Sequence, residues 1–397
     1  MEIDCEEEKP EKAAIIGAGP AGLSAAFQLA KKGFRSTIFE ALPVPGGMLR
    51  VGVPDFRLPP AVLNREIEAI IRLGVEIRYN SPLGPDLSLD DLFDQGYKAV
   101  YLAMGAHKGM ELGIPGEEAE GVVQGVRILK ETSLGQPPEM GKKAAVIGGG
   151  NVAMDVCRTM RRLGVDDVTV IYRRTRHEMP AWDEEIEAAG EEGVKFMFLA
   201  APQQILVEDG KAKGLRCIRM ELGEPDASGR RRPVPVPGSE FDLDVDMIVP
   251  AIGQVPALEA LSKEDGITIN RYGTIEVDPI SHETSRPGIF AGGDMQTGPW
   301  VAIGAVAAGN EAAISIARYL NNQDVKNGRE PIDREIAKDW REIPENAGQK
   351  PRLQMPVLPV EERITSFAEV ALGFDPRLGV AEAAKCISCG ICSECYQ

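Results

Sequence analysis

Two glycine-rich turns contain the residues with the clearest chemical potential. Residues 17–22 (GAGPAG) and residues 148–153 (GGGNVA) both follow the pattern G-x-G-x-x-G/A. In this pattern the first glycine makes a tight turn, the second lets the backbone approach a pyrophosphate, and the third position lets helix and strand pack closely. The helix that follows offers free N–H groups and its positive dipole end to the phosphates. The two turns therefore predict two dinucleotide sites in one chain.

The residues that follow each turn differ between the two sites. The strand expected at residues 36–39 ends in Glu40, whose carboxylate can accept hydrogen bonds from both ribose hydroxyls of an adenosine. The strand expected at residues 168–172 ends instead in Arg173 and Arg174, and guanidinium groups suit a 2′-phosphate. The second site is therefore expected to favour NADP over NAD, with a solvated basic loop as the alternative interpretation.

Apolar runs around the turns predict the elements that position them. A short apolar run precedes each turn and reads as a buried parallel strand, and an alanine-rich or apolar helix follows it. Further strands are expected within residues 98–106, 247–253 and 286–294, then a helix at 301–320, and residues 205–244 resemble a β-meander. The second dinucleotide domain is therefore expected to be inserted in the first, which resumes near Asn270. From residue 323 the composition turns polar and proline-rich, which predicts an extended arm.

Composition limits the class of protein. A chain of 397 residues is too long for one core, and 43% hydrophobic residues with 43 glycines suit a compact α/β protein. The formal net charge of −17 argues against nucleic acid and anionic membrane surfaces as partners. No apolar run approaches the roughly 20 residues that cross a bilayer, and the acidic N-terminal residues do not resemble a signal peptide. The 7 cysteines do not form a disulfide framework, which favours a reducing, cytoplasmic setting.

Four cysteines lie within the last dozen residues: Cys386, Cys389, Cys392 and Cys395. A C-x2-C-x2-C run suits one face of a [4Fe–4S] cluster, whereas zinc sites use two well-separated C-x2-C pairs. In ferredoxin-like chains the fourth ligand is distant and precedes a proline. Either Cys395 closes a local cluster or the last ligand lies elsewhere. The alternative is a tail without metal that docks on a partner.

Longer motifs around both turns carry a family resemblance. In addition to the first turn and Glu40, they are residues 46–59 (GGMLRVGVPDFRLP), 148–155 (GGGNVAMD), 172–174 (YRR), 179–181 (MPA) and 291–294 (AGGD). In this order they closely resemble the small subunit of glutamate synthase. The wider group includes the large subunit of NADH-dependent ferredoxin:NADP oxidoreductase and the flavin–nicotinamide part of dihydropyrimidine dehydrogenase. The resemblance covers residues 12–395.

The resemblance implies an α/β fold with two Rossmann-like dinucleotide-binding domains and an extended C-terminal arm with a cysteine cluster. FAD is expected in the first domain and NAD(P) in the inserted second. The predicted boundaries are residues 1–138 and 260–322 for the FAD-binding domain, 139–259 for the NAD(P)-binding domain and 323–397 for the arm with its ferredoxin-like motif. Members often carry an N-terminal cysteine-rich domain, whereas here only residues 1–12, with Cys5, precede the first strand.

The resemblance also implies which residues hold the cofactors. The expected FAD pyrophosphate and ribose contacts are Gly17, Ala18, Gly19, Pro20, Ala21 and Glu40. Around the flavin they are Gly47, Leu49, Gly52, Arg57 (to phosphate or ring), Gly105, Gly293, Asp294 (to the ribityl chain) and the backbone of Val301 and Ala302. On the nicotinamide side they are Gly150, Asn151, Val152, Ala153, Arg173, Arg174, Ala251 and Gly253.

These observations predict a FAD-dependent NAD(P)H oxidoreductase that forms one subunit of a larger redox complex. It would exchange hydride between nicotinamide and flavin and pass electrons through iron–sulfur centres to or from a metal-containing partner subunit. Hydride transfer needs stacking and orientation more than an acid or base, so no catalytic side chain is named. No C-x-x-C lies in the nicotinamide domain, where thioredoxin reductases keep their redox disulfide. A stand-alone disulfide reductase that uses the tail cysteines, and a structural flavin-containing subunit, are the alternatives.

Overall fold

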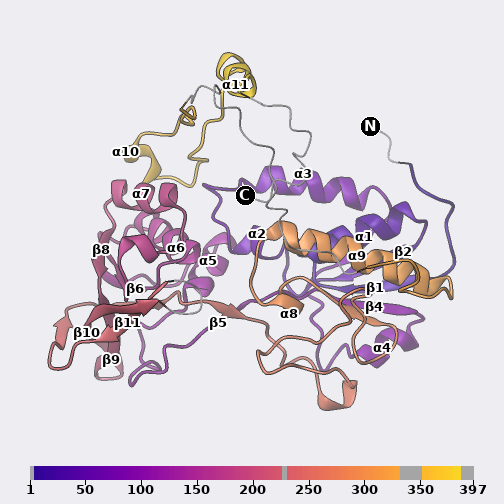
Figure 1. Ribbon diagram of the computed structural model, residues 1–397, viewed down its shortest axis with the longest axis horizontal. Coiled ribbons are helices and arrows are strands. Elements are labelled where there is room, and N and C mark those ends of the chain that lie inside the picture. Colours follow the sequence, from indigo (N-terminus) through magenta and orange to yellow (C-terminus); the bar gives the residue numbers. More distant parts are fainter. Residues whose placement is uncertain (1–3, 226–229, 331–350, 386–397) are drawn as a thin grey trace.

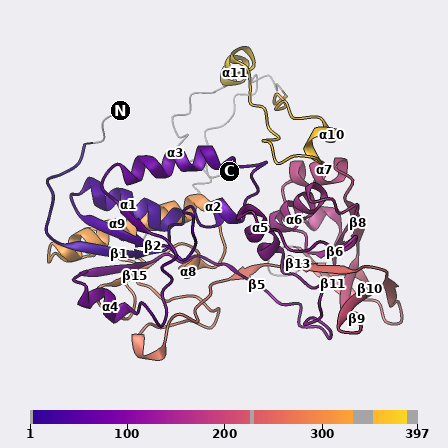
Figure 2. The ribbon, with the colours of Figure 1, turned by 180° about the vertical axis from the view of Figure 1, so that it is seen from behind.

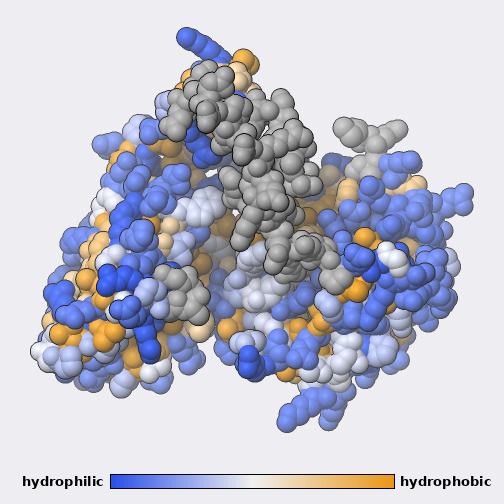
Figure 3. Space-filling model, in the orientation of Figure 1, coloured by the Kyte–Doolittle hydropathy of each residue, from blue (hydrophilic) through white to orange (hydrophobic). Residues whose placement is uncertain are grey.

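The computed structural model describes residues 4–225, 230–330 and 351–385. Two units lie side by side, each built on a parallel sheet, and the C-terminal arm runs above both (Figure 1). Figure 2 shows the same arrangement from behind. Hydrophilic side chains dominate the face shown in Figure 3, as 26% charged residues would lead one to expect.

The first unit is built on a five-stranded parallel sheet in the order β15-β4-β1-β2-β3. Its strands are β1 (Lys12–Ile16), β2 (Arg35–Phe39), β3 (Glu76–Arg78), β4 (Ala99–Leu102) and β15 (Ile289–Ala291). Its helices are α1 (Pro20–Lys31), α2 (Met48–Val51), α3 (Pro60–Ile71), α4 (Leu89–Asp94), α8 (Asp294–Thr297) and α9 (Ala302–Leu320). The inner strands are apolar on both faces because both faces of the sheet are covered.

The second unit has a four-stranded parallel sheet in the order β13-β6-β7-β8. Its elements are β6 (Lys143–Ile147), β7 (Asp167–Tyr172), β8 (Lys195–Phe198), β13 (Met247–Pro250), α5 (Gly125–Ser133), α6 (Asn151–Arg162) and α7 (Asp183–Glu191). The strands expected within residues 98–106, 247–253 and 286–294 are confirmed as β4, β13 and β15. The chain reaches β15 only after the second sheet, yet this strand pairs with β4 of the first.

An antiparallel sheet packs beside the second unit. It contains β9 (Ala200–Glu208), β10 (Lys211–Pro225), β11 (Arg231–Pro235) and β12 (Phe241–Leu243). The sheet differs from the expected meander because β12 pairs with β10, not with β11. The long strand β10 explains this: it pairs with β12 near Arg216 and with β11 further along. Part of the expected hairpin tip, residues 226–229, lies outside the described residues.

The units are joined by two short strands and by a contact between α2 and α5, where the Ser133 hydroxyl donates to the Arg50 carbonyl at 2.6 Å. Short strands β5 (Lys108–Gly109) and β14 (Gln254–Val255) pair antiparallel where the chain passes between the sheets. In the arm, α10 (Val360–Arg363) lies close to α7, and α11 (Pro376–Ala383) has no buried residue (Figure 1). A bridge between Val357 and Ala371 closes the arm on itself.

Candidate nucleotide-binding sites

The first glycine-rich turn lies between β1 and α1. Gly17 has φ +105°, and a Cβ there would come within 2.5 Å of the Ala103 carbonyl oxygen, so only glycine fits the turn. Helix α1 begins after Gly19 with Pro20 at its first position, and neither a capping side chain nor an acidic residue occupies its first turn. Its N-terminal N–H groups and dipole are therefore available to an anion.

Glu40 lies at the carboxyl end of β2, against this turn. Its carboxylate accepts the Ala18 N–H at 2.7 Å and the Leu42 N–H at 2.8 Å. The side chain is buried, and burial raises the pKa of Glu40. The carboxylate thus fixes the turn and lies where a ribose is expected.

The 46–52 segment forms the opposite wall. The Gly46 N–H donates to the Ala18 carbonyl at 2.8 Å, and a Cβ on Gly47 would lie 2.8 Å from Gly19 Cα. Leu49 packs against the core of the first unit, and Gly52 ends α2. The structure thus brings together the residues expected to contact the pyrophosphate and the flavin.

The start of α9 lies on the same side of the first sheet. A Cβ on Gly293 would lie 3.1 Å from the Ala21 Cβ, so the β15–α8 turn contacts α1. Asp294 accepts the Trp300 N–H at 3.3 Å, and burial raises the pKa of its carboxyl. Val301 and Ala302 are exposed at the helix start, where no side chain provides a cap.

These features fit FAD. Two helix N-termini without side-chain caps, a wall of glycine backbone and a buried carboxylate at the β2 end match phosphate, pyrophosphate and ribose chemistry. Gly105 follows β4 next to the first turn, beside the His107 ring. The contacts of these residues with FAD remain predictions.

The second turn repeats the geometry of the first. A Cβ on Gly148 would lie 2.3 Å from the Ala251 carbonyl oxygen, which places Ala251 beside this turn. Gly150 precedes α6 without a side-chain cap, and Asn151 Oδ1 accepts the Trp182 N–H at 3.1 Å. Val152 and Ala153 follow on the first turn of α6. An anion can therefore bind here as at α1.

The two arginines after β7 occupy different surroundings. Arg173 is exposed, whereas Arg174 is 5% exposed and its Nε donates to the Arg231 carbonyl at 2.7 Å. An open pocket of about 420 Å³ adjoins them, lined by Arg176, His177, Met179, Ala181 and Asp183. Arg176 also pairs with Asp183 at 3.2 Å. In the sequence, only the basic residues 173–176 and the 179–181 motif indicate this pocket.

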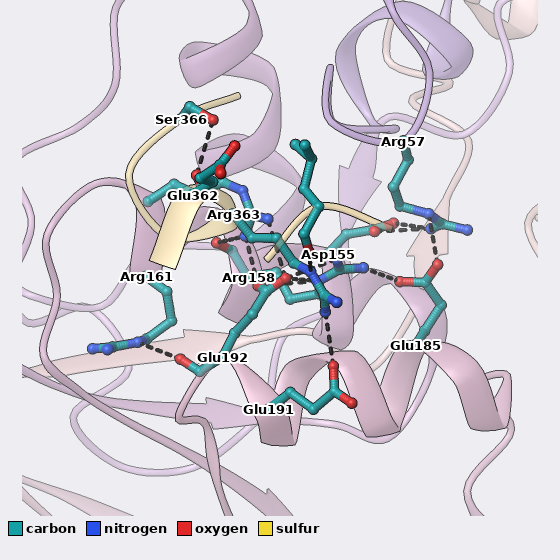
Figure 4. A network of polar contacts seen from close by, with 12 residues as sticks. Arg57, Asp155, Arg158, Arg161, Glu185, Glu191, Glu192, Glu362, Arg363 and Ser366 are labelled. Carbon is teal, nitrogen blue, oxygen red and sulfur yellow. Dashed lines mark hydrogen bonds and ion pairs between the residues drawn. The ribbon is translucent and has the colours of Figure 1, made fainter. Parts of the chain in front are cut away.

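Arg57 lies at the boundary between the units (Figure 4). Its Nη1 donates to both carboxylate oxygens of Asp155, at 2.8 and 2.9 Å, and its Nε lies 3.1 Å from Glu185. The guanidinium thus contacts two carboxylates of the second unit, those of Asp155 and Glu185. Its expected contact with the flavin remains a prediction. Sequence reasoning did not anticipate this pairing, although Asp155 is part of the second motif.

A glutamine links the second turn to the first unit. Gln254 follows Gly253 in β14, and its Nε2 donates to the Ala106 carbonyl at 3.0 Å and lies 3.9 Å from Met48 Sδ. The Ala251–Gly253 segment therefore leads from the second turn toward residues 46–52, where the flavin is expected. Nothing in the residue types singled out Gln254.

Metal and thiol chemistry is limited in the part of the chain that the structure describes. Cys386, Cys389, Cys392 and Cys395 lie outside it, and within it no three His, Cys, Asp or Glu side chains form a metal-binding group. Cys157 and Cys217 are buried and unpaired, and burial raises the pKa of Cys217 to about 12. No described helix is both long and apolar enough to cross a bilayer.

Comparison with known proteins identifies the family to which this chain belongs. Residues 11–309 match the pyridine nucleotide-disulphide oxidoreductase family. The chain belongs to this family. It is 38% identical to the glutamate synthase [NADPH] small chain of Escherichia coli over 78% of this chain and 69% of that protein. The resemblance to the glutamate synthase small subunit is therefore confirmed, and the chain is an oxidoreductase whose family implies FAD and NAD(P) binding.

Two relatives match almost the whole chain. It is 48% identical to the NADP(+)-dependent formate dehydrogenase subunit beta of Moorella thermoacetica over 96% of this chain. It is 38% identical to the NADPH-Fe(3+) oxidoreductase subunit beta of Geobacter sulfurreducens, again over 96% of this chain. The matched region spans 54% of the first relative and 62% of the second.

Solved structures share the fold. Mycobacterium tuberculosis FprA in complex with NADPH superposes with a TM-score of 0.66 at 21% identity, covering 79% of this chain and 85% of that one. Lactococcus lactis thioredoxin reductase gives a TM-score of 0.59 at 24% identity, covering 79% and 99%. The expected α/β fold with two dinucleotide-binding domains is confirmed.

Proposed function

We propose that this chain is the FAD-dependent, NADPH-oxidising or NADP-reducing subunit of a larger redox complex. The observation that carries the proposal is the pair of glycine-rich turns on two separate parallel sheets, each followed by a helix start that no side chain caps. Strand β14 follows the segment beside the second turn and pairs with β5, and Gln254 of β14 lies next to Met48 in the 46–52 segment. One chain thus offers a flavin site and a nicotinamide site that face a common boundary.

The protein's part in this reaction is binding and orientation. Glu40 and the α1 N-terminus would hold the adenosine ribose and pyrophosphate of FAD, and Gly47 would leave room for its backbone. When bound, FAD supplies the two-electron and one-electron chemistry that no side chain here can supply. The α9 N-terminus at Val301 and Ala302 would stabilise negative charge at the pyrimidine edge of the flavin.

NADP is the proposed nicotinamide cofactor. Arg173 presents an exposed guanidinium surface at the end of β7, beside the pocket lined by Arg176 and His177, whereas Arg176 is already paired with Asp183 and Glu187. A 2′-phosphate is the anion that such a surface suits. The names of the relatives above also specify NADP(+) or NADPH.

The proposal also includes electron transfer through an iron–sulfur cluster to or from a partner subunit. The C-x2-C-x2-C-x2-C run at residues 386–395 supplies thiolates at a spacing that suits a [4Fe–4S] cluster. The two relatives that match 96% of this chain are named as beta subunits, of a formate dehydrogenase and of an Fe(3+) oxidoreductase. We infer that these thiolates would hold an iron–sulfur cluster through which electrons pass between the flavin and a metal-containing partner.

Three measurements on the purified protein test this proposal. We expect about one FAD per chain, dye reduction with NADPH at a lower KM than with NADH, and iron with acid-labile sulfide that depends on the tail cysteines. Protein that binds no FAD would contradict the proposal. A dithiol titration that shows a redox-active disulfide without iron would favour a disulfide reductase, and nicotinamide binding without flavin bleaching would favour a structural subunit.

A further inference from the structure

A loop of the first unit is held by the second unit. Phe56 and Arg57 lie between α2 and α3, and Arg57 makes its two-bond contact with Asp155 across the boundary. Asp155 lies early in α6, two residues after Ala153 of the second glycine-rich motif. Helix α6, which begins at the second glycine-rich turn, thus contacts directly the segment that follows residues 46–52. Nη1 of Arg57 is shared between both oxygens of Asp155 while Nε lies 3.1 Å from Glu185, so one planar guanidinium joins two carboxylates of the second unit.

Phe56 makes the second contact across this boundary. Its side chain is fully buried, with the Arg162 guanidinium 3.8 Å and the Arg158 guanidinium 4.8 Å from the ring centroid. Both guanidinium groups are fixed by Glu192, at 2.9 Å from Arg158 and 2.6 Å from Arg162. Although burial raises the pKa of Glu192, these two arginines lower it overall, so the carboxylate stays charged. Desolvated cation–π contacts of this kind are among the stronger ones.

The arm closes the same boundary from outside. The Val370 N–H donates to the Phe56 carbonyl at 2.9 Å, and the Phe367 ring centroid lies 6.3 Å from that of Phe56. On its other side the arm is fastened to the second unit, because Arg363 donates to Glu191 of α7 at 2.8 Å (Figure 4). The Arg363 side chain is 7% exposed, whereas that of Glu191 is 56% exposed, so solvent reaches the pair from the α7 side.

The arm segment has a fixed shape of its own. The Leu358 N–H donates to the Val370 carbonyl at 3.0 Å, and the Leu372 N–H donates to the Pro356 carbonyl at 2.9 Å. Arg363 also donates to the Leu358 carbonyl. Residues 356–372 therefore form a closed loop that contacts both units at once.

We propose that Phe56, Arg57 and residues 356–372 form an interdomain joint that fixes the nicotinamide unit against the flavin unit. Units joined by two short strands and one small helix contact, that of α2 with α5, are expected to move relative to each other unless a further interface holds them. The joint supplies that interface, and its residues act as positioning residues. The consequence for hydride transfer rests on the function proposed above, because a shift of about 1 Å between reacting atoms can cost on the order of 10²-fold in rate. Since the arm leads into the tail cysteines, binding of a partner to the tail would act on the same joint.

The test compares full-length, FAD-loaded variants of the joint with matched surface controls. Arg57→Met removes the contact, and Arg57→Lys keeps the charge but not the planar group that reaches Asp155 and Glu185 through separate nitrogens. Arg363→Gln releases the arm from α7. The controls are Arg65→Met on α3 and Arg377→Gln on α11, both on exposed side chains.

Measurements of rate, cofactor binding and structure separate positioning from folding or binding. Single-turnover flavin reduction by NADPH should slow at least tenfold in Arg57→Met and about threefold in Arg363→Gln, with Arg57→Lys between wild type and Arg57→Met. In Arg363→Gln, which lies outside the expected cofactor sites, FAD content and NADPH affinity should change less than twofold. Hydrogen exchange should accelerate at residues 52–60 and 356–372 in Arg57→Met and Arg363→Gln, and small-angle X-ray scattering should show a larger radius of gyration. The controls should match wild type in all of these.

Two results would overturn the joint. One is unchanged exchange, scattering and reduction rate in Arg57→Met and Arg363→Gln. The other is loss of FAD from Arg57→Met while Asp155→Asn retains it, which would make Arg57 a flavin ligand. If NADPH fails to reduce the wild-type flavin, the proposed function fails instead, and exchange and scattering still decide whether the joint exists. Arg363→Gln lies at the arm, so it provides the decision if the Arg57 variants do not fold.

Discussion

At the scale of single residues, the two arginines after β7 show how similar sequence positions acquire different roles. Arg173 is exposed and can meet a cofactor, whereas the buried Arg174 donates to the Arg231 carbonyl of β11. The sequence offered both as 2′-phosphate ligands. The contact with a strand 57 residues further on could not be predicted, because nothing local indicates it.

We therefore expect Arg173→Ala to raise the KM for NADPH by roughly tenfold or more and to leave the KM for NADH almost unchanged. A lost charge-assisted contact costs on the order of 1.5–3 kcal/mol, and the shared part of the cofactor is untouched. Arg174→Ala should instead lower the melting temperature, because it removes a buried side chain and its hydrogen bond to the Arg231 carbonyl. Steady-state kinetics with both cofactors and thermal unfolding check this, with Arg65→Ala as control. Equal effects of Arg173→Ala on both cofactors would refute the NADP assignment.

Asp155 gives a second prediction at this scale. Burial raises the pKa of its carboxyl to about 6. The neighbouring Glu185 also raises this pKa, whereas Arg57 and Arg158 lower it. Because the pKa is raised on folding, the folded state holds this proton between about pH 4 and 6 while the unfolded state has lost it. The stabilisation by Asp155 is therefore present at low pH and is lost as the pH rises through about 6.

Asp155→Asn removes this titration. Between about pH 4.5 and 7.5, the free energy of unfolding of wild type should fall relative to the variant by on the order of 2–3 kcal/mol. Guanidinium unfolding curves of both proteins at each pH provide the measurement. A difference in stability that does not change with pH would mean that Asp155 stays ionised throughout.

At the scale of elements, strands and helices followed from local pattern. Apolar runs located β4, β13 and β15, and the alanine-rich run located α9 (Ala302–Leu320), because each element buries its own residues. The pairing of β12 with β10 was missed, since strand order depends on contacts between distant segments. The Arg57–Asp155 contact was missed for the same reason, because it joins residues 98 positions apart.

The wall at Gly47 provides a test of one element. Gly47 has φ +54°, and a Cβ would lie 2.8 Å from Gly19 Cα, so Gly47→Ala should force the two walls of the FAD site apart. We expect FAD affinity to fall at least tenfold. Gly74→Ala is the matched control, because Gly74 has φ +90° and nothing within 4 Å of its Cβ position. Fluorescence titration of apoprotein with FAD measures both, and equal losses would show that backbone strain alone is responsible.

At the scale of the whole molecule, the arm connects the flavin–nicotinamide boundary to the tail cysteines. A chain that ends after Lys385 keeps residues 356–372 and both glycine-rich turns. We expect it to retain FAD and NADPH–dye activity and to lose electron transfer to its native partner. A chain that ends at residue 350 should also lose most of its flavin reduction rate, because Val370 no longer contacts Phe56. Full-rate reduction of the partner by the first truncation would show that the cysteine tail is passive.

The most direct measurement is anaerobic mixing of the FAD-loaded, full-length protein with NADPH while the visible absorbance of the flavin is followed. The two sites on facing units predict that one equivalent of NADPH bleaches the flavin within a single turnover, and that NADH does so more slowly at the same concentration. A flavin that stays oxidised with both cofactors, in protein shown to bind them, would contradict hydride transfer between the two proposed sites.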